Sequence, residues 1–249
     1  MMDWGLRDKT VLVTGASSVL GQCITIALAK EGANMVLHYN DSTDKIKSLT
    51  NVLSGLGCDY RLIKADFSNL EEISDMFLKL RDWKCNIDVL INNASIHCKK
   101  NIVYMNIAQY EKIMSVNLKA PYILCKNMLR EMIVRKRGII VNISSSITKR
   151  SRVNESVYGM TKGGIEAMTR LLANEAGAYN VRVNCIAPGP FVSPMNELDS
   201  ESKKEIIKSS ALKDIVTPEE IANVILFLCS DYSSAITGQV FNVDNGFEI

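Results

Sequence analysis

The feature that most constrains this chain is a regular alternation of short β-branched runs with amphipathic helical patterns along its whole length. Such an alternation predicts βαβ units, whose parallel strands form a sheet with helices on both faces. We therefore expect an α/β fold with one doubly wound domain over residues 1–249 and a seven-stranded parallel sheet. The expected strands are Thr10–Thr14, Asn34–Tyr39, Tyr60–Ala65, Val89–Asn92, Gly138–Ile143, Val181–Ile186 and Gln239–Val243.

Composition favours one large core and argues against several classes of function. The chain has 249 residues, of which 47% are hydrophobic, so it can bury a core without disulfides or a structural metal. Its formal net charge is only +2, which argues against a nucleic-acid or anionic-membrane partner. The two histidines, His38 and His97, are too few to predict a zinc site or a Ser-His-Asp triad.

Cysteine usage and hydropathy predict where the protein resides. The seven cysteines are scattered and form no Cys-x-x-Cys pair, as is usual in a reducing compartment. The start, Met1 to Lys9, lacks the apolar run of a secretory signal. The apolar run Ile221–Cys229 is too short to cross a bilayer. We therefore expect a soluble, cytoplasmic protein.

Local patterns predict two helix starts and one flap. Ser68 followed by Glu71 has the spacing of a capping box, and Thr217-Pro218-Glu219-Glu220 has it again with proline at the first helical position. The segment from Pro188 to about Asp214 follows a strand, has no clear period and is rich in charge. It is predicted to be a mobile flap over the site, with a disordered surface excursion as the alternative.

Residues 14–21 form a glycine-containing turn between the first strand and the first helix. A strand–turn–helix unit of this kind presents backbone N–H groups and the positive helix N-terminus to a pyrophosphate. The turn resembles the Thr-Gly-x-x-x-Gly-x-Gly motif of the short-chain dehydrogenase/reductase family, with Gly15 and Gly21 in place. Val19 stands at the middle glycine, so we expect the backbone there either to approach the cofactor less closely or to need a strained φ value that a β-branched residue resists.

Further family elements follow in order. Asp66-Phe67 resembles the pair that flanks the adenine ring, and Asn92-Asn93-Ala94-Ser95 resembles the Asn-Asn-Ala-Gly turn, with Ser95 replacing glycine. The resemblance extends from about Leu6 to Gly246 and implies a Rossmann-type fold. The cofactor contacts that it implies are Gly15, Ser17, Ser18, Leu20, Gly21, Asn40, Asp66, Phe67, Asn93, Ala94, Tyr158, Lys162, Pro188, Gly189, Phe191 and Ser193.

The end of the second predicted strand should select between NAD(H) and NADP(H). An acidic residue there binds the ribose 2′-OH, whereas a basic residue accepts a 2′-phosphate. Tyr39 stands where NAD-using relatives carry Asp, and Asn40 stands where NADP-using relatives carry Arg. The sequence therefore favours NADP(H), unless the carboxylate of Asp41 reaches the ribose.

The clearest chemical pattern is Tyr158-x-x-x-Lys162, with Ser145 and Asn117 upstream, which matches the catalytic tetrad of the family. Residues four apart share one helix face, so Lys162 can approach the Tyr158 phenol. A positive charge about 4 Å away at an effective dielectric of about 20 contributes roughly 4 kcal/mol. That energy would bring the phenol pKa down from about 10 towards neutrality.

The resemblance implies a role for each member of the tetrad. Tyr158 is the general acid in reduction and the base in oxidation, and Ser145 donates a hydrogen bond to the reacting oxygen. Lys162 holds the nicotinamide ribose, and Asn117 anchors a water that resupplies protons. The implied reaction is hydride transfer between a nicotinamide cofactor and a carbonyl or secondary alcohol. A cofactor sensor without turnover is the alternative from another class.

The substrate and the assembly are less constrained. The chain resembles 3-oxoacyl-carrier-protein reductase-like and glucose dehydrogenase-like members, so a 3-oxoacyl thioester, small ketone, sugar or steroid is expected. The run Arg135–Arg137 fits the place where carrier-protein reductases bind their carrier. Lys149, Arg150 and Arg152 indicate either an anionic substrate or a solvated basic loop. Wide apolar helix faces predict a homotetramer or homodimer.

Overall fold

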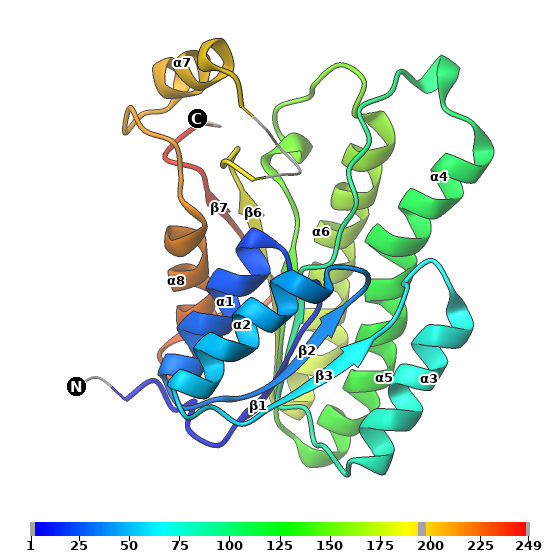
Figure 1. Ribbon diagram of the computed structural model, residues 1–249, viewed down its shortest axis with the longest axis vertical. Coiled ribbons are helices and arrows are strands. Elements are labelled where there is room, and N and C mark those ends of the chain that lie inside the picture. The colour runs from blue at the N-terminus through cyan, green and yellow to red at the C-terminus, as the bar shows by residue number, and fades with distance from the viewer. Residues whose placement is uncertain (1–2, 194–197, 248–249) are drawn as a thin grey trace.

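The computed structural model describes residues 3–193 and 198–247. The strands β1 to β7 form one parallel sheet in the order β3-β2-β1-β4-β5-β6-β7, which confirms the predicted fold class (Figure 1). Their bounds are β1 Thr10–Val13, β2 Asn34–Tyr39, β3 Tyr60–Lys64, β4 Val89–Asn92, β5 Gly138–Ile143, β6 Val181–Pro188 and β7 Val240–Val243.

Helices cover both faces of this sheet, and each face has its own core. Alternation of side chains sends Val11 and Val13 of β1 to one core and Leu12 to the other. Helices α1 (Val19–Lys30), α2 (Thr43–Gly55) and α8 (Pro218–Cys229) pack on the first face. Helices α3 (Leu70–Asp82), α5 (Ala120–Arg135) and α6 (Ser156–Ala176) pack on the second, with α4 (Ile107–Met114) beside them (Figure 1).

The strand order reverses between β1 and β4. In open parallel sheets, the loops at the carboxyl ends of the strands part at such a point and leave a crevice for a ligand. The turns after β1, β4 and β5, which carry the predicted motifs, all open on this edge of the sheet.

One predicted helix start is correct and one is wrong. At α8, Thr217 Oγ1 accepts from Glu220 N at 3.3 Å and Glu220 Oε2 accepts from Thr217 N at 2.8 Å, so the capping box is present. At α3 the cap is Asn69, whose Oδ1 accepts from Glu71 N at 2.9 Å. The Ser68 hydroxyl instead donates to Asp66 Oδ1 at 2.7 Å, so Ser68 does not cap α3.

The predicted flap has more regular structure than expected. Its first residue, Pro188, still belongs to β6 and lies opposite Val243 of β7. Helix α7 (Ser200–Ser209) follows, with Asp199 capping Ser202 N at 2.7 Å and Ile206 buried. The charged sequence hid this helix, because only one of its apolar residues is buried. The flap residues 194–197 lie outside the described part of the chain.

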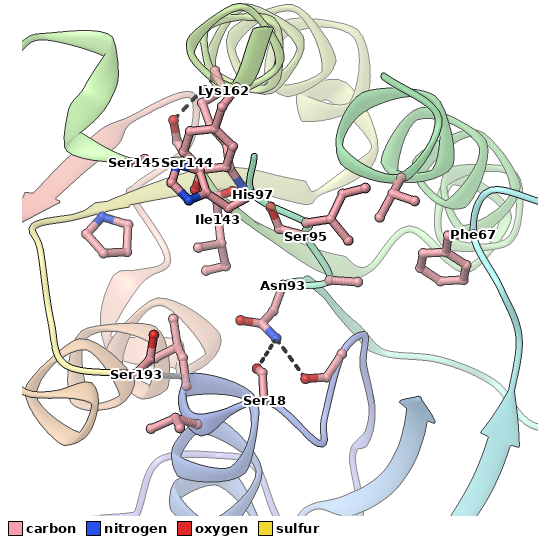
Figure 2. A pocket seen from close by; sticks show the side chains of 18 of the residues that line it. Ser18, Phe67, Asn93, Ser95, His97, Ile143, Ser144, Ser145, Lys162 and Ser193 are labelled. Carbon is pink, nitrogen blue, oxygen red and sulfur yellow. Dashed lines mark hydrogen bonds between the residues drawn. The ribbon is translucent and has the colours of Figure 1, made fainter. Parts of the chain in front are cut away.

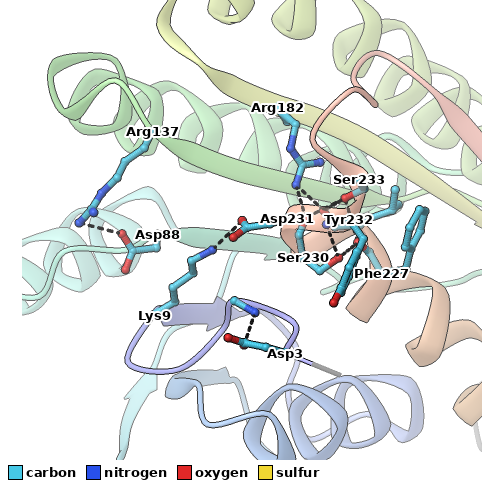
Figure 3. A network of polar contacts seen from close by, with 12 residues as sticks. Asp3, Lys9, Asp88, Arg137, Arg182, Phe227, Ser230, Asp231, Tyr232 and Ser233 are labelled. Carbon is cyan, nitrogen blue, oxygen red and sulfur yellow. Dashed lines mark hydrogen bonds and ion pairs between the residues drawn. The ribbon is translucent and has the colours of Figure 1, made fainter. Parts of the chain in front are cut away.

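A polar network holds the opposite, amino-terminal edge of the sheet together (Figure 3). Arg182 donates to the carbonyls of Leu228 and Ser230 at 2.9 and 3.0 Å, and thereby fixes the end of α8 to β6. Asp88 binds Arg135 at 3.1 Å and Arg137 at 3.7 Å. Arg135 is therefore engaged within the fold, although the sequence placed it in a carrier-binding run.

Among the described residues, none of the helices is both long and apolar enough to cross a membrane. No cluster of three or more His, Cys, Asp or Glu side chains in that part of the chain is arranged to hold a metal ion.

Candidate active site

A cavity of about 670 Å³ lies at the carboxyl edge of the sheet (Figure 2). This volume is in the range of sites that bind cofactors and drug-sized ligands. The structure brings nearly all the predicted site residues into its wall. The exceptions are Gly21, which lies within α1, and Asn117, which lies behind the wall.

The glycine turn is shaped to admit a ligand closely. Gly15 has a φ of +63°, and a Cβ there would meet Ala94 Cα at 2.9 Å, so no larger residue fits. Ser18 caps α1 by accepting from Gly21 N at 3.0 Å. Val19 is the first residue of α1 and is not among the described residues with positive φ, so the expected backbone strain at this position is not found.

Two residues of neighbouring strands fix this turn from behind. The amide of Asn93 donates to Thr14 O at 2.8 Å, to Gly15 O at 3.1 Å and to Ser18 Oγ at 3.2 Å (Figure 2). His38 Nδ1 accepts from Gly15 N at 3.1 Å, while His38 Nε2 lies 2.9 Å from Ala65 O. Because a carbonyl can only accept, Nε2 carries the proton and the imidazole is neutral.

The environment of His38 gives it a structural role at the Gly15 turn of the cavity. Burial lowers the pKa of His38 to about 4, so it stays neutral at physiological pH. Its ring stacks on Phe67 with centroids 3.9 Å apart and an interplanar angle of 7°. This role could not be predicted from the sequence, because a lone histidine in a buried strand has no motif around it.

The end of the cavity after β2, where the sequence predicts selection of the cofactor ribose, is lined by Asn40, Asp41, Ser42 and Lys45. Tyr39 does not line the cavity and packs against the core instead. Ser42 is the residue before α2, and its side chain makes no capping hydrogen bond to that helix. Sequence analysis missed Ser42 and Lys45, although a serine before a helix and a lysine one turn in are typical of phosphate contacts.

Tyr158 and Lys162 lie in the first two turns of α6, on the face that meets β5. The Lys162 ammonium donates to Ile143 O at 2.9 Å and lies 5.5 Å from the centroid of the Tyr158 ring. Ser145, from the turn after β5, forms a hydrogen bond with the Tyr158 hydroxyl, and this bond lowers the pKa of Tyr158. Ser95 also acts to lower the pKa of Tyr158. Ser95 Oγ is buried and forms no well-aligned hydrogen bond in the described part of the chain.

The predicted lowering of the tyrosine pKa is wrong for the protein by itself. Burial raises the pKa of Tyr158 to about 12, and this desolvation outweighs both serine hydroxyls. Burial also lowers the pKa of Lys162 to about 8. The Lys162 ammonium points to the Ile143 carbonyl and not, as the helical spacing had suggested, to the Tyr158 phenol. In addition, removing both groups from water has a cost that the spacing does not reveal.

Asn117 lies in a π-helical turn, Ser115–Lys119, between α4 and α5. Such turns insert one extra residue and are frequent at functional sites. Asn117 Oδ1 accepts from Ile96 N and its Nδ2 donates to Ile96 O, both at 2.8 Å. The side chain therefore fixes the chain after β4, immediately before the cavity residue His97.

Four residues of the wall form the side of the cavity beyond Tyr158, and the sequence indicated a binding role only for Arg152. They are His97, Ile147, Arg152 and Glu155. The His97 ring meets the Tyr158 ring edge-on, with centroids 4.6 Å apart. Its Nε2 lies 3.5 Å from Glu155 Oε1. Burial raises the pKa of Glu155, but the hydrogen bond and charge of His97 and the charges of Arg152 and Lys99 bring it below its usual range.

The chain matches known proteins over nearly its whole length. Residues 15–248 match a family model described as Enoyl-(Acyl carrier protein) reductase. The 3-oxoacyl-[acyl-carrier-protein] reductase FabG of Chlamydia pneumoniae is 34% identical over 246 residues, which are 98% of this chain and 99% of that protein.

Solved structures agree with this. A putative gluconate dehydrogenase from Agrobacterium tumefaciens has a TM-score of 0.94 at 28% identity and covers 99% of this chain and 98% of its own. A blue fluorescent protein from a metagenomic library, solved with NADPH, has a TM-score of 0.91 at 28% identity. The match covers 98% of this chain and 99% of that protein.

Proposed function

Because the chain belongs to the short-chain dehydrogenase/reductase family of oxidoreductases, which act on CH–OH groups, we propose that it reduces the ketone of a 3-oxoacyl thioester with NADPH. One observation carries this proposal: Tyr158, Ser145 and Lys162 lie in one wall of a cavity whose other end is the Gly15 turn. A smaller ketone is the alternative substrate within the same chemistry.

The residues of the cavity fit a nicotinamide cofactor. Only glycine fits at position 15, and the capped N-terminus of α1 faces the cavity there. Gly15, Ser17, Ser18 and Leu20 would hold the pyrophosphate, and Asp66, Phe67 and Ala94 would enclose the adenosine. Lys162, Pro188, Gly189, Phe191 and Ser193 would hold the nicotinamide half.

When bound, NADPH would supply the hydride to the carbonyl carbon. Tyr158 would then donate its proton to the carbonyl oxygen, and Ser145 would hold that oxygen by a hydrogen bond. A phenol whose pKa is about 12 keeps its proton at neutral pH, so Tyr158 carries the proton that reduction requires. Asn117 would act through the Ile96 backbone that it fixes.

The preference for NADPH is part of the proposal. Lys45 and Ser42 at the start of α2 would bind the 2′-phosphate, with Asn40 beside them. Asp41 opposes this preference, because its carboxylate would repel a phosphate. NADPH and NADH titrations, followed by nicotinamide fluorescence, test it. We expect Lys45→Gln to weaken NADPH binding about tenfold and to leave NADH binding unchanged.

The assembly is proposed to be a homodimer or homotetramer. A second groove runs between α4, α5 and α6, and its lining is mostly apolar and aromatic with a few polar residues at its side: Tyr110, Glu111, Met114, Ser115, Leu118, Lys119, Tyr122 and Met168. Tyr122 is 52% exposed and Leu171 on α6 is 64% exposed, so a wide apolar face is left uncovered in one chain. We also propose a cytoplasmic location, because all seven cysteines are free thiols, as is usual in a reducing compartment.

Product analysis tests the reaction directly. The protein is incubated with NADPH carrying deuterium at the transferable position and with S-acetoacetyl-N-acetylcysteamine, a neutral thioester. We expect a secondary alcohol with deuterium at the former carbonyl carbon. Protein that binds NADPH but forms no deuterated alcohol from this thioester or from a panel of ketones would support the cofactor-sensor alternative instead.

A further inference from the structure

The half of the cavity beyond Tyr158 carries an unusual balance of charge. In the described part of the wall, its charged or titratable side chains are His97, Arg152 and Glu155, with Lys162 deeper. The remaining acidic residues of the wall, Asp41 and Asp66, follow β2 and β3 at the opposite, adenosine end.

The single carboxylate on this side already has its partners. Glu155 is 6% exposed, and its Oε1 lies 3.5 Å from His97 Nε2 and 4.0 Å from Lys99 Nζ. A carboxylate that is buried and paired in this way has little capacity to bind a cationic substrate. The negative charge of Glu155 instead fixes His97 against the Tyr158 ring.

The arginines on the loop before α6 gather at an aromatic ring, although the charge of Arg152 also reaches Glu155 and helps to lower its pKa. The Arg150 guanidinium lies 4.4 Å from the centroid of the Phe247 ring, and that of Arg152 lies 5.8 Å from the same centroid. Neither has a carboxylate at ion-pair distance among the described residues. Two like charges are thus gathered around one buried aromatic ring, and one of them, Arg152, lines the cavity.

We propose that the substrate carries an anionic group, a carboxylate or a phosphate, that binds Arg152 with Arg150 beside it while the reacting carbonyl lies at Tyr158 and Ser145. The proposal rests on the proposed function, because it places the carbonyl at that site. A guanidinium binds both kinds of anion through two parallel hydrogen bonds, and the position of Arg152 over the Phe247 ring helps to hold it in place. An anion at this place would balance positive charge that Arg150 and Arg152 bring to the same ring.

The test compares binding of matched charged and neutral ligands to the complex with NADP+, and so does not require turnover. One pair is 3-hydroxybutanoate and its methyl ester, which tests a carboxylate. The other is 3-hydroxybutyryl-coenzyme A and S-3-hydroxybutyryl-N-acetylcysteamine, which tests a phosphate. We expect the wild-type protein to bind the charged member of one pair at least about tenfold more tightly.

Three variants locate the effect. Arg152→Gln should reduce the charged-over-neutral ratio to less than about threefold, and Arg152→Lys should restore part of it. Lys149→Gln is the matched control, since it removes one charge from the same loop but Lys149 is exposed and does not line the cavity. An unchanged NADP+ affinity shows that each variant is folded.

Equal binding within both pairs, or binding of no compound, contradicts the proposal. So does a ratio that Arg152→Gln leaves intact, or that Lys149→Gln lowers equally. Reduction of the neutral thioester by such a protein would leave the proposed reductase function standing while the anionic substrate is rejected.

Discussion

At the scale of single residues, burial sets the ionisation of the site, because it raises the pKa of Tyr158 to about 12 and lowers that of Lys162 to about 8. Tyr158, Lys162 and Ser145 were predicted from spacing, and all three line the cavity. Their pKa values depend on burial and on where each side chain points, which no spacing reveals. His38 and His97 were missed for the same reason, because their partners Gly15 and Glu155 are 23 and 58 residues away, a separation that only the fold closes.

Burial of the Lys162 ammonium should reduce the free energy of unfolding of the protein. The pKa of Lys162 is about 8 in the folded protein, against an ordinary value of 10.5. Folding therefore favours the neutral form, so the cost is complete below pH 8 and disappears as the pH rises past 10.5. We expect Lys162→Met to raise the free energy of unfolding at pH 7 by up to about 3 kcal/mol.

Urea unfolding at pH 7 and pH 10 measures this effect. The gain from Lys162→Met should shrink at pH 10, and reductase activity should be lost at both values. A variant that is less stable than the wild type at pH 7 would contradict the assigned cost.

His38 should act on cofactor binding without touching the reacting atoms. His38→Leu removes the acceptor for Gly15 N, so we expect NADPH to bind about tenfold more weakly, which corresponds to roughly 1.4 kcal/mol. His38→Asn, which keeps an acceptor, should retain more of the affinity. Fluorescence titration measures the NADPH affinity of both variants. An equal loss of affinity in the two would show that the volume of the ring, and not the hydrogen bond to Gly15 N, supports binding.

At the scale of elements, the sheet was easier to predict than the helix ends. Strand bounds differ by at most two residues from those expected, because β-branched runs end where the buried core ends. The start of α3 was misplaced because Ser68, Asn69 and Asp66 can all cap, and the chain uses Asn69. Helix α7 was missed because its sequence is mostly charged.

The corrected cap of α3 gives a test at this scale. Asn69→Ala removes the acceptor for Glu71 N and should lower the free energy of unfolding by about 1 kcal/mol. Ser68→Ala removes only an exposed hydroxyl bond to Asp66 and should change it by less than about 0.5 kcal/mol. Chemical denaturation of both variants provides the measurement, and a larger effect of Ser68→Ala would support the original placement.

At the scale of the whole molecule, topology explains why distant motifs form one site. The strand order reverses between β1 and β4, so residues more than 140 positions apart in the chain, such as Gly15 and Tyr158, line one crevice. The sequence predicted this order of elements, but it could not predict the side of the cavity beyond Tyr158. That side is built from the loops after β4 and β5, whose conformations follow no repeating pattern.

The proposed assembly can be tested on α5. Tyr122→Glu places a charge in the groove between α4, α5 and α6 and should convert the oligomer to a monomer. Val134→Glu is the control, since Val134 is 82% exposed on the same helix and does not line the groove. Light scattering gives the mass of each, and an unchanged mass for Tyr122→Glu would place the interface elsewhere.

The central claim is that Tyr158 protonates a carbonyl while NADPH is oxidised. The most direct test is the rate of NADPH oxidation with S-acetoacetyl-N-acetylcysteamine, for the wild type and for Tyr158→Phe. We predict a loss of about 100-fold to 10,000-fold in the variant, with NADPH affinity changed less than about threefold. Equal rates in the two proteins would contradict the assigned role, and no oxidation by a wild type that binds NADPH would contradict the proposed reaction.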